Sequence, residues 1–423
     1  MTLVSFIAFI VFVIVLFTFS NKEKDVFSPS KIFVAIWALV IGLADLKFSR
    51  LQTDFSGFSW LMIGISIFSF LLGLYIAFVL FIDKNLFPKN TVRDKIREFR
   101  YDEVLFFRLI LIVFSIYFVA YWGNVFFEGF IPIFHARPSE SRVYFGVFGL
   151  GMLIHLAPVV LFLIVEFFVL VKENTGKKIL LVFLGLITFI LYFFLLQRFN
   201  LILFVTMSMV FVYFSSYILT FRKFIIFSGT LAAFVFAVNL IRWSKFAANF
   251  LYYYSQMKFD IKYAILTEPY MYLVMNVENF ARAVARLEEH SFGYYTFNYL
   301  FSLTGTKRVL SEYLHLNDYP FLISGYNTYT MFWDFYRDFG VFGLSIIPLF
   351  LGLVCAISYY RMKQNPNITT VTLYSVAVFV MMFSFFNNFL GLLHFVFSVA
   401  IILLMQQIIR NNPKKPTLAE NTV

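Results

Sequence analysis

Cysteine and the common ligand-binding motifs are scarce in this chain of 423 residues. Its single cysteine, Cys355, means that no disulfide can form within the chain. No G-x-x-x-x-G-K-[ST] loop is present, which excludes a P-loop that uses ATP. The five histidines show no metal-ligand spacing, and no Asp-x-Asp pair is present to hold the metal of a nucleotide-sugar donor. We therefore expect a protein that uses no metal and no cofactor.

Charged residues are also few, at 13% of the chain, whereas hydrophobic residues make up 61%. A soluble domain is about half apolar, so the excess predicts a second apolar environment, which a lipid bilayer supplies. The net charge of +11 lies mainly in short loops between apolar runs, where basic residues interact with anionic lipid headgroups. We predict a membrane protein with no nucleic-acid partner.

Eleven apolar runs approach the length of about 20 residues that crosses the hydrocarbon core as a helix. They lie at residues 3–19, 31–46, 57–82, 104–122, 147–171, 178–196, 200–219, 223–241, 340–359, 368–386 and 389–409. Backbone groups cannot stay unpaired in lipid, so spanning segments other than barrels are helices. The first run lacks a basic leader and a small-residue cleavage site, so we interpret it as a retained helix. The sequence predicts an all-α polytopic membrane protein with about 11 transmembrane helices.

Lysine and arginine are distributed unevenly between the two alternating sets of loops. The set that includes 83–103, 172–178 and the tail from 410 carries most of them. Short basic loops stay in the cytoplasm. We therefore expect an extracytoplasmic N-terminus and a cytoplasmic C-terminus.

One predicted extracytoplasmic loop, residues 242–339, is far longer than the others. Its basic and acidic residues balance, and it holds more than half of the chain's 25 tyrosines. It is too polar to span the membrane and too apolar for a loose linker, so we expect amphipathic helices that cap the bundle. The predicted organisation is 1–241 with transmembrane helices 1–8, 242–339 as the cap loop, 340–409 with helices 9–11, and 410–423 as a cytoplasmic tail.

Within the cap loop, Tyr272–His290 has apolar residues at three- and four-residue spacing, which predicts an amphipathic helix. Glu278, Arg282, Arg286 and His290 share another face of this helix. That face fits a solvated row of i,i+4 ion pairs. It also fits a ladder of arginines facing an anion, because guanidinium groups match phosphate oxygens bidentately. Both interpretations stay open, with Arg282 and Arg286 as candidate substrate-binding residues.

The stretch GYNTYTMFWDFYRDFG, Gly325–Gly340, places charged side chains among aromatic rings just before a predicted span. An aromatic belt at the membrane boundary explains the rings, but it explains two acidic residues less well. A carboxylate that accepts a proton or orients an arginine explains them better. The D-F-G in this stretch lacks the other protein-kinase motifs. The stretch supplies Asp334 and Asp338 as catalytic candidates and Tyr329, Tyr336 and Arg337 as substrate-binding candidates.

Four more arginines are expected at the extracytoplasmic boundary, against the usual bias of basic residues. Arg137 and Arg142 flank Glu140 in the loop EGFIPIFHARPSESRVYFG, Arg198 opens a span, and Arg242 begins the cap loop. An arginine at the mouth of a bundle is costly without a partner, unless it snorkels to the interface. We expect these arginines to converge on one anionic ligand.

Three stretches together resemble the Wzy-type O-antigen polymerases, the oligosaccharide repeat-unit polymerases. GFIPIF…SESR is similar to the family's Gly-Ile-Pro followed by an arginine, and QRFNLILF to its arginine at the start of a span. NTYTMFWDFYRDFGVFG is similar to its Thr followed by Tyr-x-Asp-Phe-Gly-x-x-Gly. The likeness covers most of the chain in layout, but only these stretches in motif. The family often has glycine after the second arginine, where this chain has Phe199.

The resemblance implies a polysaccharide-synthesising enzyme of the bacterial inner membrane. It would move a growing glycan from undecaprenyl pyrophosphate to the non-reducing-end hydroxyl of a new lipid-linked repeat unit. Arg142 and Arg198 are the candidates for stabilising the leaving pyrophosphate without a metal, and Glu140 joins Asp334 and Asp338 as a candidate base. The implied partners are the lipid-linked oligosaccharide, membrane lipid and a chain-length regulator protein.

Other classes of protein fit part of the pattern. A ligase that moves finished glycan onto another lipid shares the topology and the arginines. A transporter or flippase of lipid-linked glycan needs polar residues at the bilayer midplane and often has internal repeats, and the sequence shows neither. A non-enzymatic scaffold leaves the outer arginines without a role.

Overall fold

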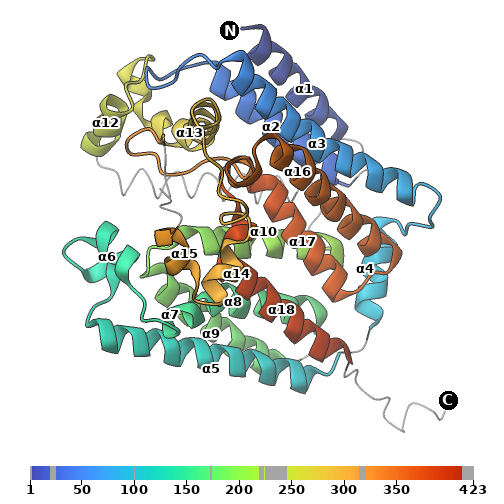
Figure 1. Cartoon of the computed structure of the whole chain (residues 1–423). Helices are drawn as coiled ribbons and strands as arrows, with labels where there is room; N and C mark the ends of the chain where they lie inside the picture. Colours follow the sequence, from blue (N-terminus) through green and yellow to red (C-terminus); the bar gives the residue numbers. More distant parts are fainter. Residues whose placement is uncertain are drawn as a thin grey trace, which may run out of the picture. The chain divides into compact units, whose positions relative to one another are not determined.

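The computed structural model describes residues 2–19, 25–99, 101–171, 174–218, 223, 245–313 and 321–411 (Figure 1). Their regular structure is helical, and no β-strand occurs among them. Within this part of the chain, Ser49 and Met257 form an isolated antiparallel bridge. The predicted all-α class is confirmed.

Six helical segments in the described part of the chain are long and apolar enough to cross a bilayer. They are α3 (Gly57–Phe81), α5 (Glu103–Glu128) with the turn after it, α7 (Leu150–Leu153) to α8 (Ala157–Leu170), α9 (Thr175–Phe193), α16 (Phe332–Gln364) and α18 (Leu393–Asn411). Shorter apolar helices are α1 (Leu3–Phe19), α10 (Arg198–Ser215) and α17 (Ile368–Phe383). This set of helices indicates a multi-pass membrane protein.

We predict eleven spans, which is more than the six long and three shorter apolar helices found among the described residues. Helix α2 (Pro29–Asp45) forms where we predict a span at 31–46, but it has only 17 residues and includes Lys31 and Asp45. The predicted span at 223–241 lies outside the described residues except for position 223. The eleven-span topology therefore stays a prediction.

The chain divides into two compact units. Unit 1 comprises Met1–Lys84, Leu219–Tyr359 and Val380–Leu393, and unit 2 comprises Asn85–Ile218, Tyr360–Phe379 and His394–Val423. Unit 1 also contains α12 (Lys245–Tyr254), η3 (Ile261–Leu266), α13 (Thr267–Val284), α14 (Asn298–Leu303), α15 (Lys307–Tyr313) and η4 (Phe389–Gly391). Unit 2 also contains α4 (Lys89–Glu98), η1 (Pro132–Phe134), α6 (Pro138–Tyr144) and η2 (Ile154–Leu156).

Helix α2 is at the centre of unit 1, where it contacts α1, α3 and α13, and Figure 1 shows α1 and α2 side by side. Phe33 stacks on Phe70 of α3 at 4.0 Å between ring centroids, and Trp37 stacks on Phe332 at 5.1 Å. The Trp37 indole N–H donates to the Ser384 hydroxyl at 2.8 Å, as a buried tryptophan requires. These contacts hold the start of α16 against α2.

Helices α3 and α16 approach each other at two glycines. A Cβ atom on Gly73 would lie 2.0 Å from the Leu349 carbonyl oxygen, and one on Gly352 would lie 2.1 Å from the Phe70 carbonyl oxygen. No side chain fits at such distances. Small residues commonly allow membrane helices to approach this closely, because association in lipid relies on van der Waals packing.

Helix α16 consists of two pieces that meet at Gly340. The φ of 59° and ψ of −142° at Gly340 are not helical, and residues other than glycine rarely adopt such a conformation. A Cβ atom on Gly343 would lie 2.1 Å from the Phe335 carbonyl oxygen, so the second piece passes close to the first. The helix thus begins at Phe332, and the residues before 340 form a separate helical piece.

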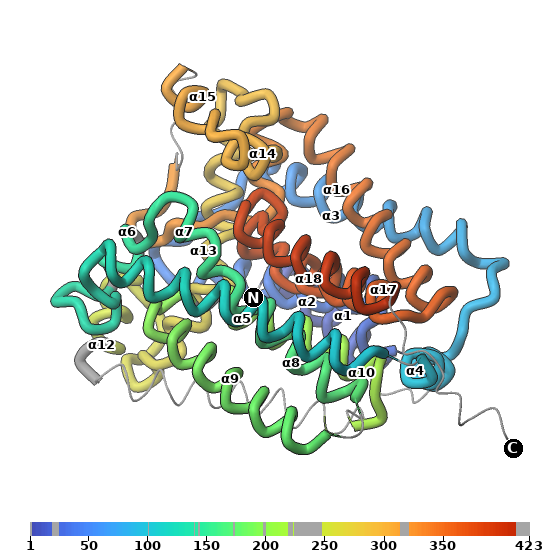
Figure 2. Tube along the Cα trace, turned by 90° about the horizontal axis from the view of Figure 1, so that it is seen from below, coloured from blue at the N-terminus to red at the C-terminus, as the bar shows by residue number. Residues whose placement is uncertain are grey.

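Unit 2 is built around α8, which contacts α5, α9 and α10 (Figure 2). Every residue from Ala157 to Ile164 is buried, as expected for a helix that is apolar on all sides. In contrast, α9 is buried along only a small part of its length. Its exposed apolar side chains suit contact with lipid.

Replacing Gly73 by leucine is expected to destabilise the protein, because the new side chain would push α3 away from the Leu349 carbonyl. Overpacking of a core costs about 1–3 kcal/mol, so thermal unfolding in detergent should occur at a lower temperature. Gly64→Leu on the same helix is the control, since nothing lies within 4 Å of its Cβ position. A Gly73→Leu variant as stable as the wild type would contradict this helix contact.

Candidate functional site

The loop after α5 is shaped by one glycine and two prolines. Gly129 ends α5 in the left-handed conformation, with a φ of 76°, which glycine adopts at no steric cost. Pro132 opens η1 and Pro138 opens α6, where a missing N–H is no disadvantage. The Ser141 hydroxyl donates to the Pro138 carbonyl at 3.2 Å. These residues fix the position of α6, which carries candidate site residues.

The loop that carries α6 is held to the turn that precedes α10. The N–H of Ile133 donates to the Phe194 carbonyl at 3.1 Å, and Arg142 Nη1 donates to the Leu196 carbonyl at 3.4 Å. Helix α10 begins at Arg198. The segment that carries Arg142 and the segment that carries Arg198, which are distant in the sequence, therefore meet at one end of unit 2. For Arg198 the structure describes the helical backbone position alone.

Three charged side chains on and beside α6 are accessible. Arg137 Nη1 and Glu140 Oε2 form an ion pair at 3.4 Å, with side chains 75% and 65% exposed. Such a pair contributes at most about 1 kcal/mol, so a ligand can compete for either group. Arg142 is also exposed, and one hydrogen bond uses only one of its five N–H donors. We call Arg137, Glu140, Arg142 and Arg198 the arginine group.

Not every predicted arginine can be placed in this group. Arg242 lies outside the described residues. Arg282, Arg286 and Arg337 belong to unit 1. In unit 2 the hydrogen bond from Arg142 to Leu196 brings the segments of Arg142 and Arg198 together, and the convergence of the arginines on one ligand stays a prediction.

Asp338 is buried and its carboxylate is fully engaged. It accepts hydrogen bonds from the Ser291 hydroxyl at 2.5 Å, from the Tyr295 N–H at 3.2 Å and from the Thr296 N–H at 2.6 Å. The N–H of Phe292 donates to the Asp338 carbonyl at 3.2 Å. Buried N–H groups must be paired, and this carboxylate pairs two of them. The geometry favours a structural role for Asp338.

Asp334 lies one helical turn before Asp338 and has a different environment. Its Oδ2 accepts from Asn388 Nδ2 at 3.0 Å, while Oδ1 of the same Asn388 side chain is buried with no hydrogen-bond partner. The two carboxylates do fall on the same side of the helix, as their spacing predicts. Asp334 is the less constrained of the two.

The aromatic residues around Asp334 pack inside unit 1. Tyr329 stacks on Trp333 at 4.8 Å between centroids, and the Tyr336 hydroxyl donates to the Val284 carbonyl at 3.0 Å. The Arg337 guanidinium lies 3.7 Å above the Tyr295 ring, in a cation–π arrangement. These candidate side chains, Tyr329, Tyr336 and Arg337, are all buried. Their contacts are with the protein, as expected for groups that support the fold.

Glu278 on α13 is fully buried and joins the helix to the loop before α3. It accepts from the Thr53 N–H and hydroxyl at 2.8 Å each, and forms ion pairs with Lys47 at 3.2 Å and Arg282 at 3.3 Å. Arg282 also donates to the Leu51 carbonyl at 2.6 Å. Burial lowers the pKa of Lys47, although the nearby Glu278 opposes this effect. Arg282 is thus committed to a structural network.

The helix predicted over Tyr272–His290 is α13, but it begins at Thr267 and ends at Val284. Arg286 follows in a turn and is exposed, and its N–H donates to the Ala283 carbonyl at 3.1 Å. The predicted ladder of four side chains along one helix face is therefore interrupted. The chain leaves the helix because the next segment pairs with the backbone of α16, an arrangement that local spacing cannot reveal.

One polar cluster in unit 2 was not predicted. The rings of His155 and His394 stack at 4.7 Å between centroids, and Asn200 Nδ2 lies 2.8 Å from His155 Nδ1. Asn200 also hydrogen-bonds the Tyr192 hydroxyl, which donates to Gln197 at 3.0 Å. Its member Asn200 lies in the first turn of α10, two residues after Arg198 of the arginine group. No sequence signal marks it, because its members come from four separate helical segments.

A second buried group in unit 2 is Glu166 on α8. Its Oε1 accepts from Gln406 Nε2 and from the Thr372 hydroxyl, the latter at 3.3 Å. Its Oε2 and the side-chain Oε1 of Gln406 are buried with no hydrogen-bond partner. These contacts join α8, α17 and α18.

Comparison of the chain with protein-family models, with curated proteins and with solved structures finds no match. The family resemblance therefore rests on the quoted motifs. Among the described residues, no three His, Cys, Asp or Glu side chains gather as a metal ion would require.

Asp338→Asn is expected to lower the free energy of unfolding by about 1–3 kcal/mol. The new amide cannot accept hydrogen bonds at both former oxygen positions, so the N–H of Tyr295 or Thr296 loses its acceptor. Thermal unfolding in detergent measures the change. Asp334→Asn is the matched control, because its side-chain oxygen can still accept from Asn388. Equal stability of the two variants would contradict the structural role of Asp338.

Proposed function

We propose that this protein polymerises lipid-linked oligosaccharide repeat units, as an integral-membrane glycosyltransferase of the bacterial inner membrane. The proposal is carried by the arginine group, in which exposed guanidinium and carboxylate groups are held together at the start of α10. Its support comes from this accessible charge, from the multi-pass architecture and from the motif resemblance. The proposed orientation has the N-terminus outside and the C-terminus in the cytoplasm.

The proposed reaction is a displacement at a sugar carbon. The non-reducing-end hydroxyl of a new repeat unit attacks C1 of the first sugar of the growing glycan. The bond from C1 to the pyrophosphate oxygen breaks, the lipid pyrophosphate leaves, and the hydroxyl proton passes to a protein base. No oxidant or reductant is needed.

The proposed roles within the arginine group follow from the charges involved. Negative charge develops on the leaving pyrophosphate, and preorganised donors stabilise it most where charge develops. Arg142 has exposed N–H donors and a backbone anchor at Leu196, so we assign it this role together with Arg198. Arg137 binds substrate beside them.

Glu140 is the proposed base. It lies on the same short helix as Arg142 and is exposed, whereas the Asp338 carboxylate already accepts three hydrogen bonds. A base must come within hydrogen-bond reach of the proton that it removes, which an exposed carboxylate can do. Asp334 is the second candidate, and the buried Tyr329, Tyr336 and Arg337 support its surroundings.

Arg142→Ala is expected to reduce polymer formation by about 10²–10³-fold, the usual effect of removing one donor to a developing negative charge. A gel of surface glycans from a deletion strain that carries the variant should show single repeats in place of a ladder. Arg142→Lys should restore only part of the activity, because an ammonium lacks the planar guanidinium geometry.

The control for this test is Arg410→Ala. Arg410 belongs to the same unit and donates to Gln407 Oε1 at 2.9 Å, near the end of α18. A normal ladder from Arg142→Ala at normal protein level would refute the proposal. Loss of even the single repeat from the final acceptor in the deletion strain would favour a ligase instead.

Glu140→Gln is expected to slow polymerisation by about 10²–10⁴-fold, the usual contribution of a general base. Protein level and melting temperature should stay unchanged, since Glu140 makes only an exposed ion pair. Glu312→Gln removes a comparable exposed pair, with Arg308 at 3.0 Å, and should leave the ladder intact. Equal ladders from both variants would exclude Glu140 as the base and direct attention to Asp334.

A further inference from the structure

Glu166 is a buried carboxyl group that the proposed reaction does not use. It lies on α8, within one of the segments long and apolar enough to cross a bilayer, and its side chain is fully buried. Thr372 on α17 and Gln406 on α18, which contact it, are fully buried as well, and all three residues belong to unit 2. A charged residue inside a membrane segment is costly and commonly marks a functional site. A charge on Glu166 would therefore need a partner.

Glu166 forms no ion pair with any lysine or arginine that the structure describes. Its hydrogen-bond partners in that part of the chain, Gln406 and Thr372, are both neutral. The Tyr101 phenol lies close enough to sense a charge on Glu166, but its hydroxyl donates to the Ile96 carbonyl at 3.2 Å. Taking an unpaired carboxylate out of water is so costly that such a group commonly takes up a proton instead.

The hydrogen bonds of this cluster are one hydrogen short. The Gln406 amide donates to Glu166 Oε1 and to the Thr372 hydroxyl oxygen, the latter at 2.5 Å. The Thr372 hydroxyl donates to the same Glu166 Oε1 at 3.3 Å. These bonds use both N–H groups of the amide and the one O–H of the threonine. Glu166 Oε2 and Gln406 Oε1 are left buried without a partner, although their side chains are already in contact.

A single proton on Glu166 Oε2 completes these hydrogen bonds. The new O–H can donate to Gln406 Oε1, while the Gln406 amide continues to donate to Glu166 Oε1. This is the ring that a carboxylic acid and a primary amide form, in which each group donates once and accepts once. Exchanging the amide nitrogen and oxygen of Gln406 leads to the same requirement, because it would set two acceptor oxygens against each other. The proton thus removes both the unpaired charge and the unpaired acceptors.

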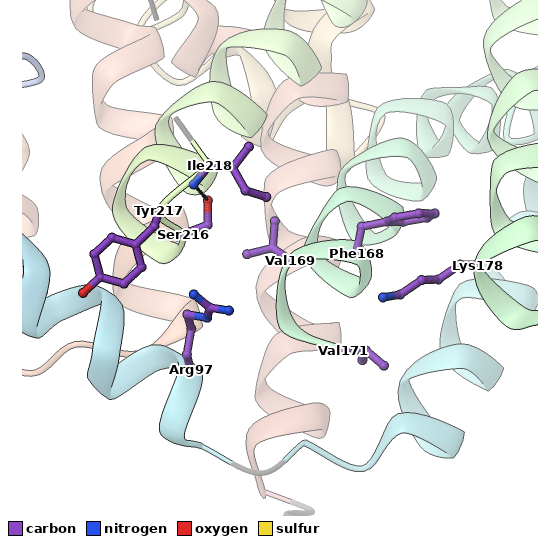
Figure 3. Close-up of a pocket in the computed structure, with 8 residues that line it drawn as sticks. All are labelled: Arg97, Phe168, Val169, Val171, Lys178, Ser216, Tyr217 and Ile218. Carbon is purple, nitrogen blue, oxygen red and sulfur yellow. Dashed lines mark hydrogen bonds between the residues drawn. The ribbon is translucent and has the colours of Figure 1, made fainter. Parts of the chain in front are cut away.

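Solvent reaches the end of α8 close to Glu166. A pocket of about 480 Å³ has Phe168, Val169 and Val171 in its lining, at the end of this helix (Figure 3). Val169 follows Glu166 by three residues, so the pocket lies within about one helical turn of the carboxyl group. Thr369, near the start of α17, adds a buried hydroxyl with no hydrogen-bond partner. A proton can therefore enter and leave at this end of unit 2.

We propose that Glu166 is a proton-binding site and is a neutral carboxylic acid in the folded protein. The proton comes from hydronium in the solvent, which leaves as water when the O–H bond forms on Oε2. In this form the acid–amide pair joins α8 to α18, and Thr372 joins both to α17. Loss of the proton returns an unpaired charge to the contact between these helices. None of the arginine group belongs to this cluster, so its test does not depend on the proposed function.

The test measures infrared absorption of the purified full-length protein at neutral pH, in a detergent without carbonyl groups. A neutral carboxylic acid has a C=O band well separated from the bands of an ionised carboxylate. The wild type should show a neutral C=O band that Glu166→Gln lacks. This variant should fold normally, because its amide can donate to Gln406 Oε1 and accept from Gln406 as the acid does. Loss of carboxylate bands instead would show an ionised Glu166, balanced by a water or a cation, and would overturn the proposal.

Glu312→Gln is the control for an ionised group, because this exposed glutamate pairs with Arg308, and it should lose carboxylate bands only. Gln406→Leu tests the acid–amide pair. The acid band should remain and move to a higher frequency, because the acid carbonyl loses the N–H of Gln406. Gln407→Leu is the matched control on the same helix, since Gln407 is exposed, and it should leave the band in place. An unshifted band in Gln406→Leu would refute the pairing.

Discussion

The carboxylate of Asp338 is the acceptor on which the arrangement of unit 1 depends. It accepts hydrogen bonds from the N–H groups of Tyr295 and Thr296. These buried N–H groups of the segment after α13 are therefore paired only while the first piece of α16 stays in place. That same piece presents Phe332 to Trp37 of α2. The glycine that follows Asp338 then turns the chain into the longer piece that meets α3. Segments that are far apart in the sequence thus depend on one buried carboxylate.

The motifs that give the chain its family resemblance perform different physical tasks. In YRDFGVFG, the aspartate is a buried acceptor, Gly340 adopts a conformation suited to glycine, and Gly343 allows close approach to Phe335. In RPSESR, the charged groups stay exposed beside the start of α10. The described contacts of the first motif are structural. The chemistry of the proposed function therefore rests on the second.

Some features of the fold were accessible from the sequence and others were not. Apolar runs predicted α3, α9 and α18 to within a few residues, because a spanning helix must be continuously apolar. The same reasoning missed the end of α13, which pairing with α16 decides. It also placed Glu278 on a helix face that is either solvated or turned toward an anion, whereas Lys47, Thr53 and Arg282 enclose this side chain. Amphipathic spacing reports which residues share a face, but it does not report what covers that face.

The sequence by itself determined that this is a helical membrane protein, since hydropathy acts locally along each segment. It also identified the segments that hold the exposed arginines, because a charged residue next to an apolar run can be recognised from the order of residues alone. Only the tertiary structure decided which charges are available. The side chains of Asp338 and Arg282 are hydrogen-bonded to distant segments, whereas those of Arg142 and Glu140 stay accessible to a ligand. The reason is that burial and pairing depend on which helices meet, and those meetings join residues far apart in the chain.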